Sequence, residues 1–422
     1  MSEMPTPGQA PTARRAAFGF IFAASIMNAI SFGIMIPVLP NLIRSFLGGN
    51  TASGTAQAAQ WQFVFATAWG LMQFVFGPIL GMLSDRYGRR PVMLISIFGL
   101  AVDFLFMAFA PTLAWLLVGR VFNGMTASTF STANAYVADV TTPERRARNY
   151  GLMGSAFSIG FLLGPTLGGF LAEINLRLPF MVAAALCGVN WLYGLIFLPE
   201  SLAPERRLTA FAWRRANPLG SLRLLRSHRE LLDLALVNFL FFLAQNVLPN
   251  VFVFYTTWRY RWSYGFLGVT FLITGALGIL VSAFLVGPVV KRVGERGAVL
   301  LGAFAGAVGF VIYALAPTGT VYFIGMPIFA LMGLMQPGLQ GLMTRRVGPN
   351  EQGQLQGANQ SLQGIAAIVG PAIFTLTFAW ALEHDATLHL PGLPILIAAA
   401  LLVLAFALSA RAARVAAPAA SA

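Results

Sequence analysis

Residues 81–90 read GMLSDRYGRR, and residues 287–296, which lie 206 positions later, read GPVVKRVGER. The same offset relates further pairs of residues in order and without a gap: Ala110 and Ala316, Pro143 and Pro349, Gly151 and Gly357, Gly164 and Gly370. A chain that repeats half its length in the same order is typical of a duplicated fold. In a membrane, two such halves face each other across a central site.

The composition places this chain in a membrane. Of its 422 residues 57% are hydrophobic and only 10% are charged, whereas soluble domains carry about 25% charged residues. About 20 apolar residues cross the hydrocarbon core as a helix, and continuous apolar runs exclude the alternating pattern of a strand barrel. We therefore predict an all-α integral membrane protein with twelve spans: 18–40, 60–83, 91–110, 113–137, 149–173, 179–198, 231–256, 264–290, 298–316, 320–344, 354–380 and 391–411.

The positive charges predict the orientation of the chain. The two six-helix halves are residues 1–198 and 231–422, and a linker at 199–230 joins them. Most of the 27 Lys and Arg residues fall in the terminal segments, the linker and the loops on its side. This bias places both termini in the cytoplasm. It also accounts for the net charge of +13 without nucleic-acid binding. The basic stretch 206–229 is expected to lie on the anionic inner leaflet, and a topological role is favoured over a regulatory one.

Two ionisable residues lie inside the predicted spans. Asp103 precedes Ala110 by seven residues, which places it about 10 Å below the outer boundary. Arg120 lies at the same depth in the next, antiparallel span. Either charge alone would be costly there, so we predict that they pair. Helix movement would change the balance between desolvation and the arginine charge, and hence the proton affinity of the carboxylate. Proton coupling is favoured, and a permanent structural pair is the alternative.

Uncharged amides indicate an amphiphilic cavity. In the fourth span Arg120, Asn123, Phe130 and Asn134 are expected close to one helical face. Amides and aromatic walls suit a substrate cavity, whereas simple interhelical hydrogen bonds, worth about 0.6 kcal/mol on average, are the alternative. The candidate cavity residues are Asn28, Asn123, Asn134, Asn238, Gln245, Asn246, Gln336 and Gln340.

Small residues predict close helix packing. Gly70, Gly77 and Gly81 follow one face of the second span. The fifth span carries Gly160, Gly164, Pro165, Gly168 and Gly169. Small residues at a spacing of four let helix backbones approach.

These motifs resemble those of the major facilitator superfamily. Residues 81–90 resemble its loop 2–3 signature, residues 120–124 its helix-four motif, and residues 160–169 the helix-five motif of antiporters. Residues 37–40 (PVLP), 102–104 (VDF), 353–357 and 369–371 resemble the tetracycline efflux branch of the drug/proton antiporters. The resemblance implies that Asp103 and Arg120 belong to the proton and substrate machinery. It also implies a cytoplasmic gate motif made of Gly81, Asp85, Arg86, Gly88, Arg89, Arg90 and Asp139.

The chain also departs from that branch. The tetracycline pumps that it resembles carry aspartates where Asn28 and Gly306 stand. Asp103 is therefore the one deep carboxylate, which argues against transport of a tetracycline–metal chelate. The outer loop 381–392 contains His384, Asp385 and His389, and we expect it to be solvated rather than to bind a metal.

The sequence therefore predicts a transporter of the bacterial inner membrane. It is expected to export an amphiphilic, drug-like small molecule in exchange for protons, as a monomer, with the proton gradient instead of a cofactor. Because the sequence shows no phosphate-binding loop and no nucleophile triad, we expect no enzymatic activity. The alternatives are a proton-coupled or facilitative carrier of an endogenous metabolite, and a membrane sensor or scaffold that does not transport. At the offset of 206, Asp103 corresponds to Gly309 and Arg120 to Met326, so the first half is expected to handle protons.

Overall fold

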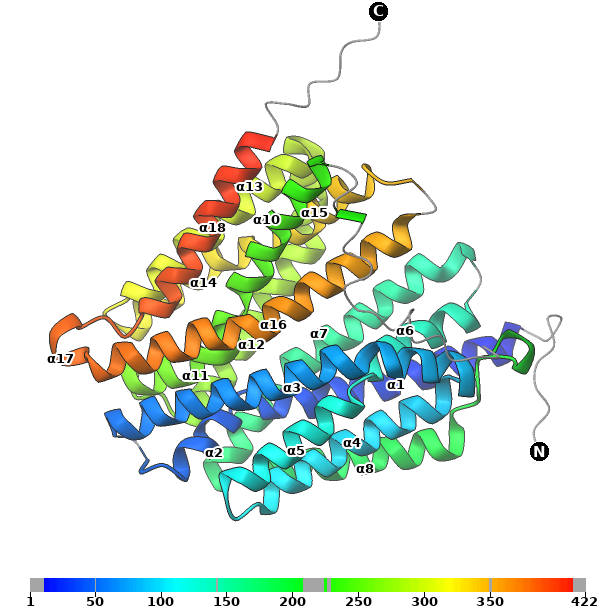
Figure 1. Ribbon diagram of the computed structural model, residues 1–422, viewed down its shortest axis with the longest axis horizontal. Helices are drawn as coiled ribbons and strands as arrows, with labels where there is room; N and C mark the ends of the chain where they lie inside the picture. The colour runs from blue at the N-terminus through cyan, green and yellow to red at the C-terminus, as the bar shows by residue number, and fades with distance from the viewer. Residues whose placement is uncertain are drawn as a thin grey trace, which may run out of the picture. The chain divides into compact units, whose positions relative to one another are not determined.

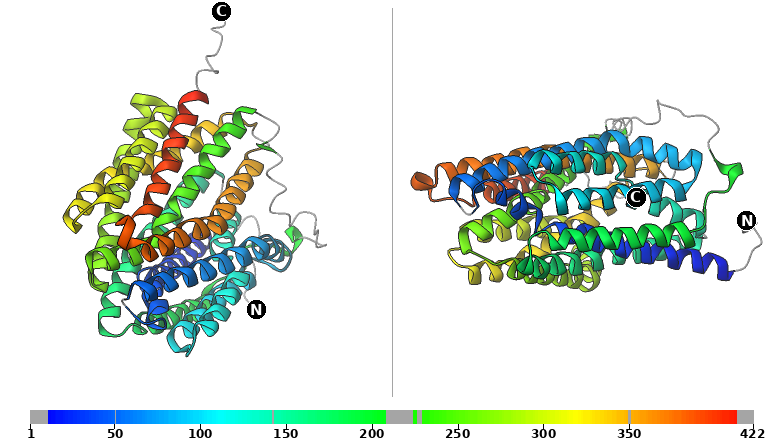
Figure 2. Two further views of the ribbon diagram at one scale, coloured as in Figure 1. Left: turned by 60° about the vertical axis from the view of Figure 1, so that its left-hand side comes forward. Right: turned by 90° about the horizontal axis from the view of Figure 1, so that it is seen from below.

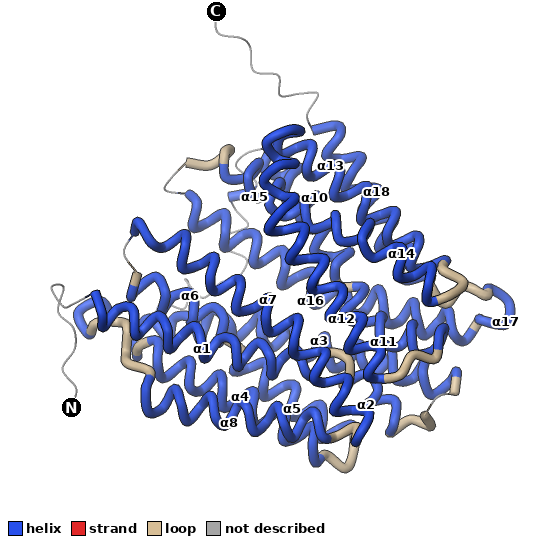
Figure 3. The backbone as a smooth tube through the Cα atoms, turned by 180° about the vertical axis from the view of Figure 1, so that it is seen from behind, coloured by secondary structure: helices blue, strands red, loops and turns tan. Residues whose placement is uncertain are grey.

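The computed structural model describes residues 11–49, 51–141, 143–207, 224–225, 229–348 and 351–412 (Figure 1). Throughout these ranges the chain forms helices and loops, with no strand (Figure 3). The predicted all-α fold is therefore confirmed. Most of the basic stretch 206–229 lies outside the described residues.

Ten apolar stretches of the described chain are long enough to cross a membrane. The predicted fourth span is missing from this set because it is divided between two short helices. The predicted eighth and ninth spans form one continuous stretch, Tyr264–Leu315, in which Gly294 has a left-handed φ of 73°. The multi-pass character is thus established by length and hydropathy, whereas the count of twelve stays a prediction.

Contacts divide the chain into two compact units. The first comprises Met1–Leu39, Leu71–Asn217 and Tyr264–Leu272. In it α1 packs along α7, and α4 packs against α5 and α8. Its helices are α1 (Pro11–Met35), the later part of α3 (Ala52–Tyr87), α4 (Arg89–Phe109), α5 (Leu113–Thr126), α6 (Thr129–Val140), α7 (Pro143–Ile174), α8 (Leu178–Phe197), the short η1 (Pro204–Arg206) and the start of α12 (Tyr264–Leu280).

The second unit comprises Pro40–Gly70, Pro218–Ser263 and Ile273–Ala422. In it α13 and α10 both pack against α18 (Figure 2), and α10 also packs against α16. Its elements include α2 (Leu39–Ser45), α10 (Arg229–Gln245), α11 (Val247–Tyr260), η4 (Val281–Leu285), α13 (Val286–Leu315), α14 (Gly319–Ala330), η5 (Leu331–Leu334), α15 (Met335–Thr344), α16 (Gln352–Glu383), α17 (Asp385–Leu388) and α18 (Leu393–Ala412).

The predicted fourth span, 113–137, is not one helix. It is broken between α5 and α6, where Ser128 has φ −130° and ψ 10°. The hydroxyl of Thr126 donates to the carbonyl oxygens of Phe122 and Asn123, both at 3.1 Å. Such side-chain bonds compete with the helical backbone ladder. Arg120 and Asn123 therefore lie on α5 and Asn134 on α6, so the prediction of one shared helical face was wrong.

The helix-five glycines pack α7 closely against α1. A side chain at Gly164 would place its Cβ 2.6 Å from the carbonyl oxygen of Ile30 and 2.7 Å from Cα of Gly33. Gly160 and Gly168 likewise face the α1 backbone, while Gly169 faces Gly268 of α12, whose Cα is 3.0 Å from the ideal Cβ position. The predicted role of these glycines in close packing is confirmed.

The second-span glycines behave differently. A Cβ atom placed on Gly70 would lie 3.5 Å from the carbonyl oxygen of Ala367 on α16, which is ordinary contact. By contrast, no atom of the described residues lies within 4 Å of that position at Gly77 or Gly81. Close packing was therefore wrongly predicted for Gly77 and Gly81, because spacing alone does not show which helical face meets a neighbour.

Candidate functional site

Asp103 on α4 and Arg120 on α5 form a buried ion pair. The side chain of Asp103 is 0% exposed and that of Arg120 is 5% exposed. Arg120 Nε donates to Oδ1 of Asp103 at 3.1 Å, and Arg120 Nη2 contacts Oδ2. The pairing predicted from equal depth is confirmed.

Local structure explains how the two groups meet. The chain reverses between α4 and α5 in a short connection that contains Pro111, so the two helices are antiparallel neighbours. Gly119 provides the room, because a Cβ there would lie 3.0 Å from Oδ1 of Asp103 and 2.8 Å from Cβ of Phe106. Each charge neutralises the other in a buried setting, where removing one partner of such a pair typically costs about 3–5 kcal/mol.

A polar cavity of about 150 Å³ lies among α10, α15 and α16 in the second unit. It brings together three of the predicted cavity residues, Asn238, Gln336 and Gln340. Sequence reasoning missed most of its remaining lining. The full set is Asn238, Phe242, Gln336, Gln340, Gln356, Asn359, Gln360 and Gln363.

The missed residues had a visible signal. Gln356, Asn359, Gln360 and Gln363 are spaced as i, i+3, i+4 and i+7, which places them on one face of α16. Four amides at this spacing in an otherwise apolar span indicate a polar face, as the amides of the other helices did.

The other predicted cavity residues lie in varied settings. Asn246 is not among the lining residues of this cavity: its Nδ2 donates to the carbonyl oxygen of Phe242 at 2.9 Å, and its Cβ lies 2.6 Å from the ideal Cβ position of Gly370. Gln245 and Asn134 are exposed, whereas Asn123 is buried. Asn28 is buried at 2% exposure, and its Oδ1 accepts no hydrogen bond from the described residues.

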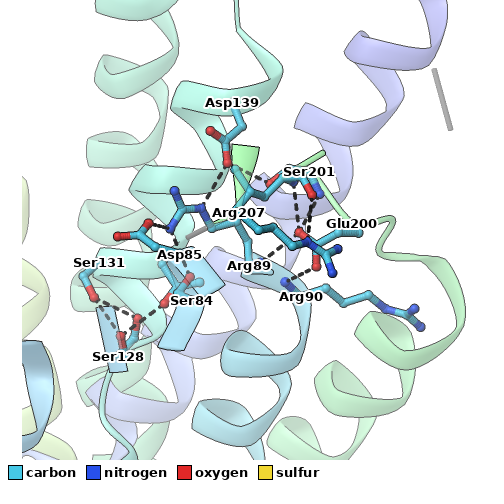
Figure 4. A network of polar contacts seen from close by, with 12 residues as sticks. Ser84, Asp85, Arg89, Arg90, Ser128, Ser131, Asp139, Glu200, Ser201 and Arg207 are labelled. Carbon is cyan, nitrogen blue, oxygen red and sulfur yellow. Dashed lines mark hydrogen bonds and ion pairs between the residues drawn. The ribbon is translucent and has the colours of Figure 1, made fainter. Parts of the chain in front are cut away.

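The gate motif forms a network of charges at the α3–α4 turn (Figure 4). Arg89 is its centre: Nε donates to Oδ2 of Asp139 at 3.0 Å, Nη1 donates to Oγ of Ser84 at 3.2 Å, and Nη1 also contacts Asp85. The turn itself is Gly88, whose φ of 110° favours glycine. Arg86 lies over the ring of Tyr87, 5.3 Å from its centre. The side chain of Arg90 donates to the carbonyl oxygen of Leu195.

Glu200 completes this network and was missed by sequence reasoning. Its Oε1 accepts hydrogen bonds from the backbone N–H groups of Arg89 at 2.8 Å, Ser201 at 2.9 Å and Leu202 at 3.0 Å. Its Oε2 accepts from the N–H of Arg90 at 3.2 Å. Glu200 thereby caps the N-terminus of α4, where a negative charge is favourable. The adjacent Ser201 hydroxyl donates to Asp139 at 3.1 Å.

The second repeat carries a related ion pair of opposite polarity. Arg345 Nη2 lies 2.8 Å from Oε1 of Glu295. At the offset of 206 these residues correspond to Asp139 and Arg89, so acid and base have exchanged places. The offset of 206 from Asp139 leads to Arg345. The sequence could therefore have indicated this second ion pair.

Two further observations bear on metal binding. An aspartate in place of Gly306 would clash with its neighbours, because its Cβ would lie 2.8 Å from both Leu402 Cδ1 and Met332 Cγ. Among the described residues no three His, Cys, Asp or Glu side chains are grouped closely enough to hold a metal ion.

Comparison with known proteins decides the family. The model of the Major Facilitator Superfamily matches residues 21–371. The chain belongs to the major facilitator superfamily. It is 38% identical over 359 residues to the class C tetracycline resistance protein of Escherichia coli, covering 85% of this chain and 89% of that one. It is 36% identical over 378 residues to the class G protein of Vibrio anguillarum, covering 88% and 94%.

A solved structure supports the same assignment. The crystal structure of the human organic anion transporter MFSD10 (TETRAN) has a TM-score of 0.69 at 25% identity, covering 95% of this chain and 100% of that chain. This major facilitator protein is therefore a multi-pass membrane transporter rather than an enzyme, and it belongs with the tetracycline resistance proteins. The resemblance predicted from its motifs is confirmed.

Proposed function

We propose that this protein is a proton-coupled antiporter that exports a small, amphiphilic, drug-like compound by alternating access. The observation that carries the proposal is the buried pair of Asp103 and Arg120. Burial favours the neutral carboxyl group, while the neighbouring guanidinium favours the carboxylate. A helix movement that separates the two groups therefore raises the proton affinity of Asp103, and a movement that restores the pair releases the proton.

The relatives support an export role. The class C and class G proteins carry tetracycline resistance in their names, and a further relative, 25% identical over 369 residues, is the multidrug resistance protein 2 of Bacillus subtilis. In this proposal the protein is a monomer of the bacterial inner membrane with both termini in the cytoplasm. The proton gradient supplies the energy, and no cofactor takes part.

The gate motif and the amide cavity take separate roles in this proposal. The network around Arg89 holds the α3–α4 turn to the end of α6 and to the segment after α8, and it is the cytoplasmic latch. The amides of α10 and α15 form part of the substrate cavity. Because Asn28 and Gly306 stand in place of aspartates, the proposed cargo is a free compound rather than a metal chelate.

A transport assay tests the export proposal. Purified protein in liposomes with an imposed pH gradient is given tetracycline, chloramphenicol, tetraphenylphosphonium and an organic anion such as benzoate. An antiporter accumulates at least one amphiphilic drug only while the gradient lasts, and a protonophore abolishes the accumulation. A carrier that only equilibrates a compound gives the same final level with and without the gradient. Selective movement of the anion would instead favour the activity named for the human structural relative. The absence of any movement would favour a sensor or scaffold.

A further inference from the structure

The cavity among α10, α15 and α16 is built almost entirely from carboxamides. Seven of its eight lining residues are Asn or Gln, and the eighth is Phe242. None of the eight is charged. Since apolar spans rarely carry polar groups without a function, this concentration of amides calls for a ligand or for a structural network.

A structural network accounts for only part of the cluster. Asn238 Nδ2 donates to Oδ1 of Asn359 at 3.0 Å, and Asn359 Nδ2 donates to Oε1 of Gln340 at 3.4 Å. Asn238 and Asn359 are buried, with 4% and 7% exposure. These three amides form a hydrogen-bonded chain that links the three helices to one another.

The remaining four amides also line the cavity but are not part of that hydrogen-bonded chain. Gln336, Gln356, Gln360 and Gln363 are all exposed, and none of their side chains makes a hydrogen bond with the described residues. A structural role alone would leave these groups without purpose. Their side chains line the cavity together with the three bonded amides, and the helices that carry them, α15 and α16, are labelled beside α10 in Figure 1.

The chemistry of the lining defines the ligand. Each amide offers both N–H donors and a carbonyl acceptor, so a ligand with hydroxyl, carbonyl or amide groups is matched. A cation or an anion would lose hydration without meeting an opposite charge. Phe242, at 5% exposure, adds one apolar contact. The volume of about 150 Å³ is below the roughly 300–1,000 Å³ of pockets that enclose whole drug-sized ligands, so the cavity holds one polar fragment.

We propose that this amide cavity is a subsite for the uncharged, hydroxyl- and carbonyl-bearing edge of the transported compound, and that Gln356, Gln360 and Gln363 of α16 select it. The identity of this ligand as cargo rests on the proposed export function. Binding itself needs neither transport nor a proton gradient, so it is tested separately.

Equilibrium binding to the purified full-length protein in detergent tests the subsite. Radiolabelled chloramphenicol is the uncharged probe, because it carries two hydroxyl groups and an amide, and tetraphenylphosphonium is the cationic probe. Wild type is expected to bind chloramphenicol and to bind tetraphenylphosphonium more weakly. Gln360→Leu is expected to weaken chloramphenicol binding about tenfold, the effect of one or two hydrogen bonds, and Gln356→Leu serves as a second variant if the first does not fold.

Gln354→Leu is the matched control. Gln354 is exposed on the same helix, two residues from Gln356 and therefore on a different face, and this variant is expected to bind like wild type. Gln360→Glu introduces a charge and is expected to reverse the preference, with tetraphenylphosphonium bound more tightly than chloramphenicol.

Several results would overturn the subsite. The first is a wild type that does not bind chloramphenicol or that prefers the cation. The second is chloramphenicol binding that is unchanged in both Gln360→Leu and Gln356→Leu. The third is a Gln360→Glu variant that keeps the wild-type preference. A protein that binds as expected but transports without proton coupling would leave the subsite intact and contradict only the antiport proposal.

Discussion

At the scale of single residues, the buried ion pair and the cap of α4 show two different uses of a carboxylate group. Asp103 is wholly enclosed and depends on Arg120 for compensation. Glu200 is half-buried and satisfies four backbone N–H groups. In the proposed mechanism the first arrangement makes protonation of Asp103 sensitive to helix position, whereas the second holds a helix end in place.

The cap makes a prediction about stability. Glu200→Ala removes the acceptor for the N–H groups of Arg89 and Arg90 and is expected to lower the free energy of unfolding by about 1–2 kcal/mol. Glu205→Ala is the control, because Glu205 is exposed in η1. Thermal unfolding in detergent, followed by tryptophan fluorescence, measures both. Equal melting temperatures for the two variants would show that Glu200 does not stabilise α4.

Some contacts between residues could be predicted from the sequence and others could not. The depths of Asp103 and Arg120 follow from counting along two neighbouring helices, so their pairing could be predicted. Glu200 contacts Arg89 across 111 positions of sequence. Only the folded chain brings them together, so no local pattern indicated this contact.

At the scale of helices, the contact between α1 and α7 depends on the absence of side chains. Gly164 faces the backbone of Ile30 and Gly33. In the described part of the chain no atom lies within 4 Å of the ideal Cβ position of Gly154, on the same helix. Both glycines lie within α7, but only Gly164 is packed against another helix.

This difference predicts opposite effects of the same substitution. Gly164→Ala is expected to destabilise the protein by about 1–3 kcal/mol through overpacking. Gly154→Ala is expected to be neutral or to stabilise by up to about 1 kcal/mol through helix propensity. Thermal unfolding of the purified variants measures both changes, and a Gly164→Ala variant as stable as Gly154→Ala would contradict the packing role.

Helix existence was easier to predict than helix continuity. Hydropathy located the membrane stretches, because about 20 apolar residues are needed to cross the bilayer. It did not reveal the break at Ser128, where the hydroxyls of Thr126 and Ser131 donate to the backbone carbonyl oxygens of Asn123 and Ser128. Such bonds offer the backbone local alternatives to the helical ladder. The amide face of α16 carried a periodic signal, but its position beside α10 and α15 required the structure.

At the scale of the whole molecule, the two repeats share motif positions but differ in the chemistry of the side chains at those positions. The ion pair of Arg89 and Asp139 returns as Glu295 and Arg345 with the charges exchanged. The positions of Asp103 and Arg120 return as Gly309, which packs against Phe329, and Met326, which is 2% exposed. The chemistry at the equivalent place in the second repeat is thus apolar, and the polar cavity of the second unit is lined instead by amides of α10, α15 and α16.

In the proposed function this asymmetry places proton coupling in the first repeat, and the central claim has one most direct test. Wild type, Asp103→Asn and the control Asp233→Asn, which changes an exposed acid on α10, are placed in liposomes that contain a pH-sensitive dye. A pH gradient is imposed, and a compound that wild type transports is added. We expect substrate-dependent proton flux in wild type and in Asp233→Asn, and only the background of empty liposomes in Asp103→Asn. A folded Asp103→Asn protein with the proton flux of wild type would contradict the account.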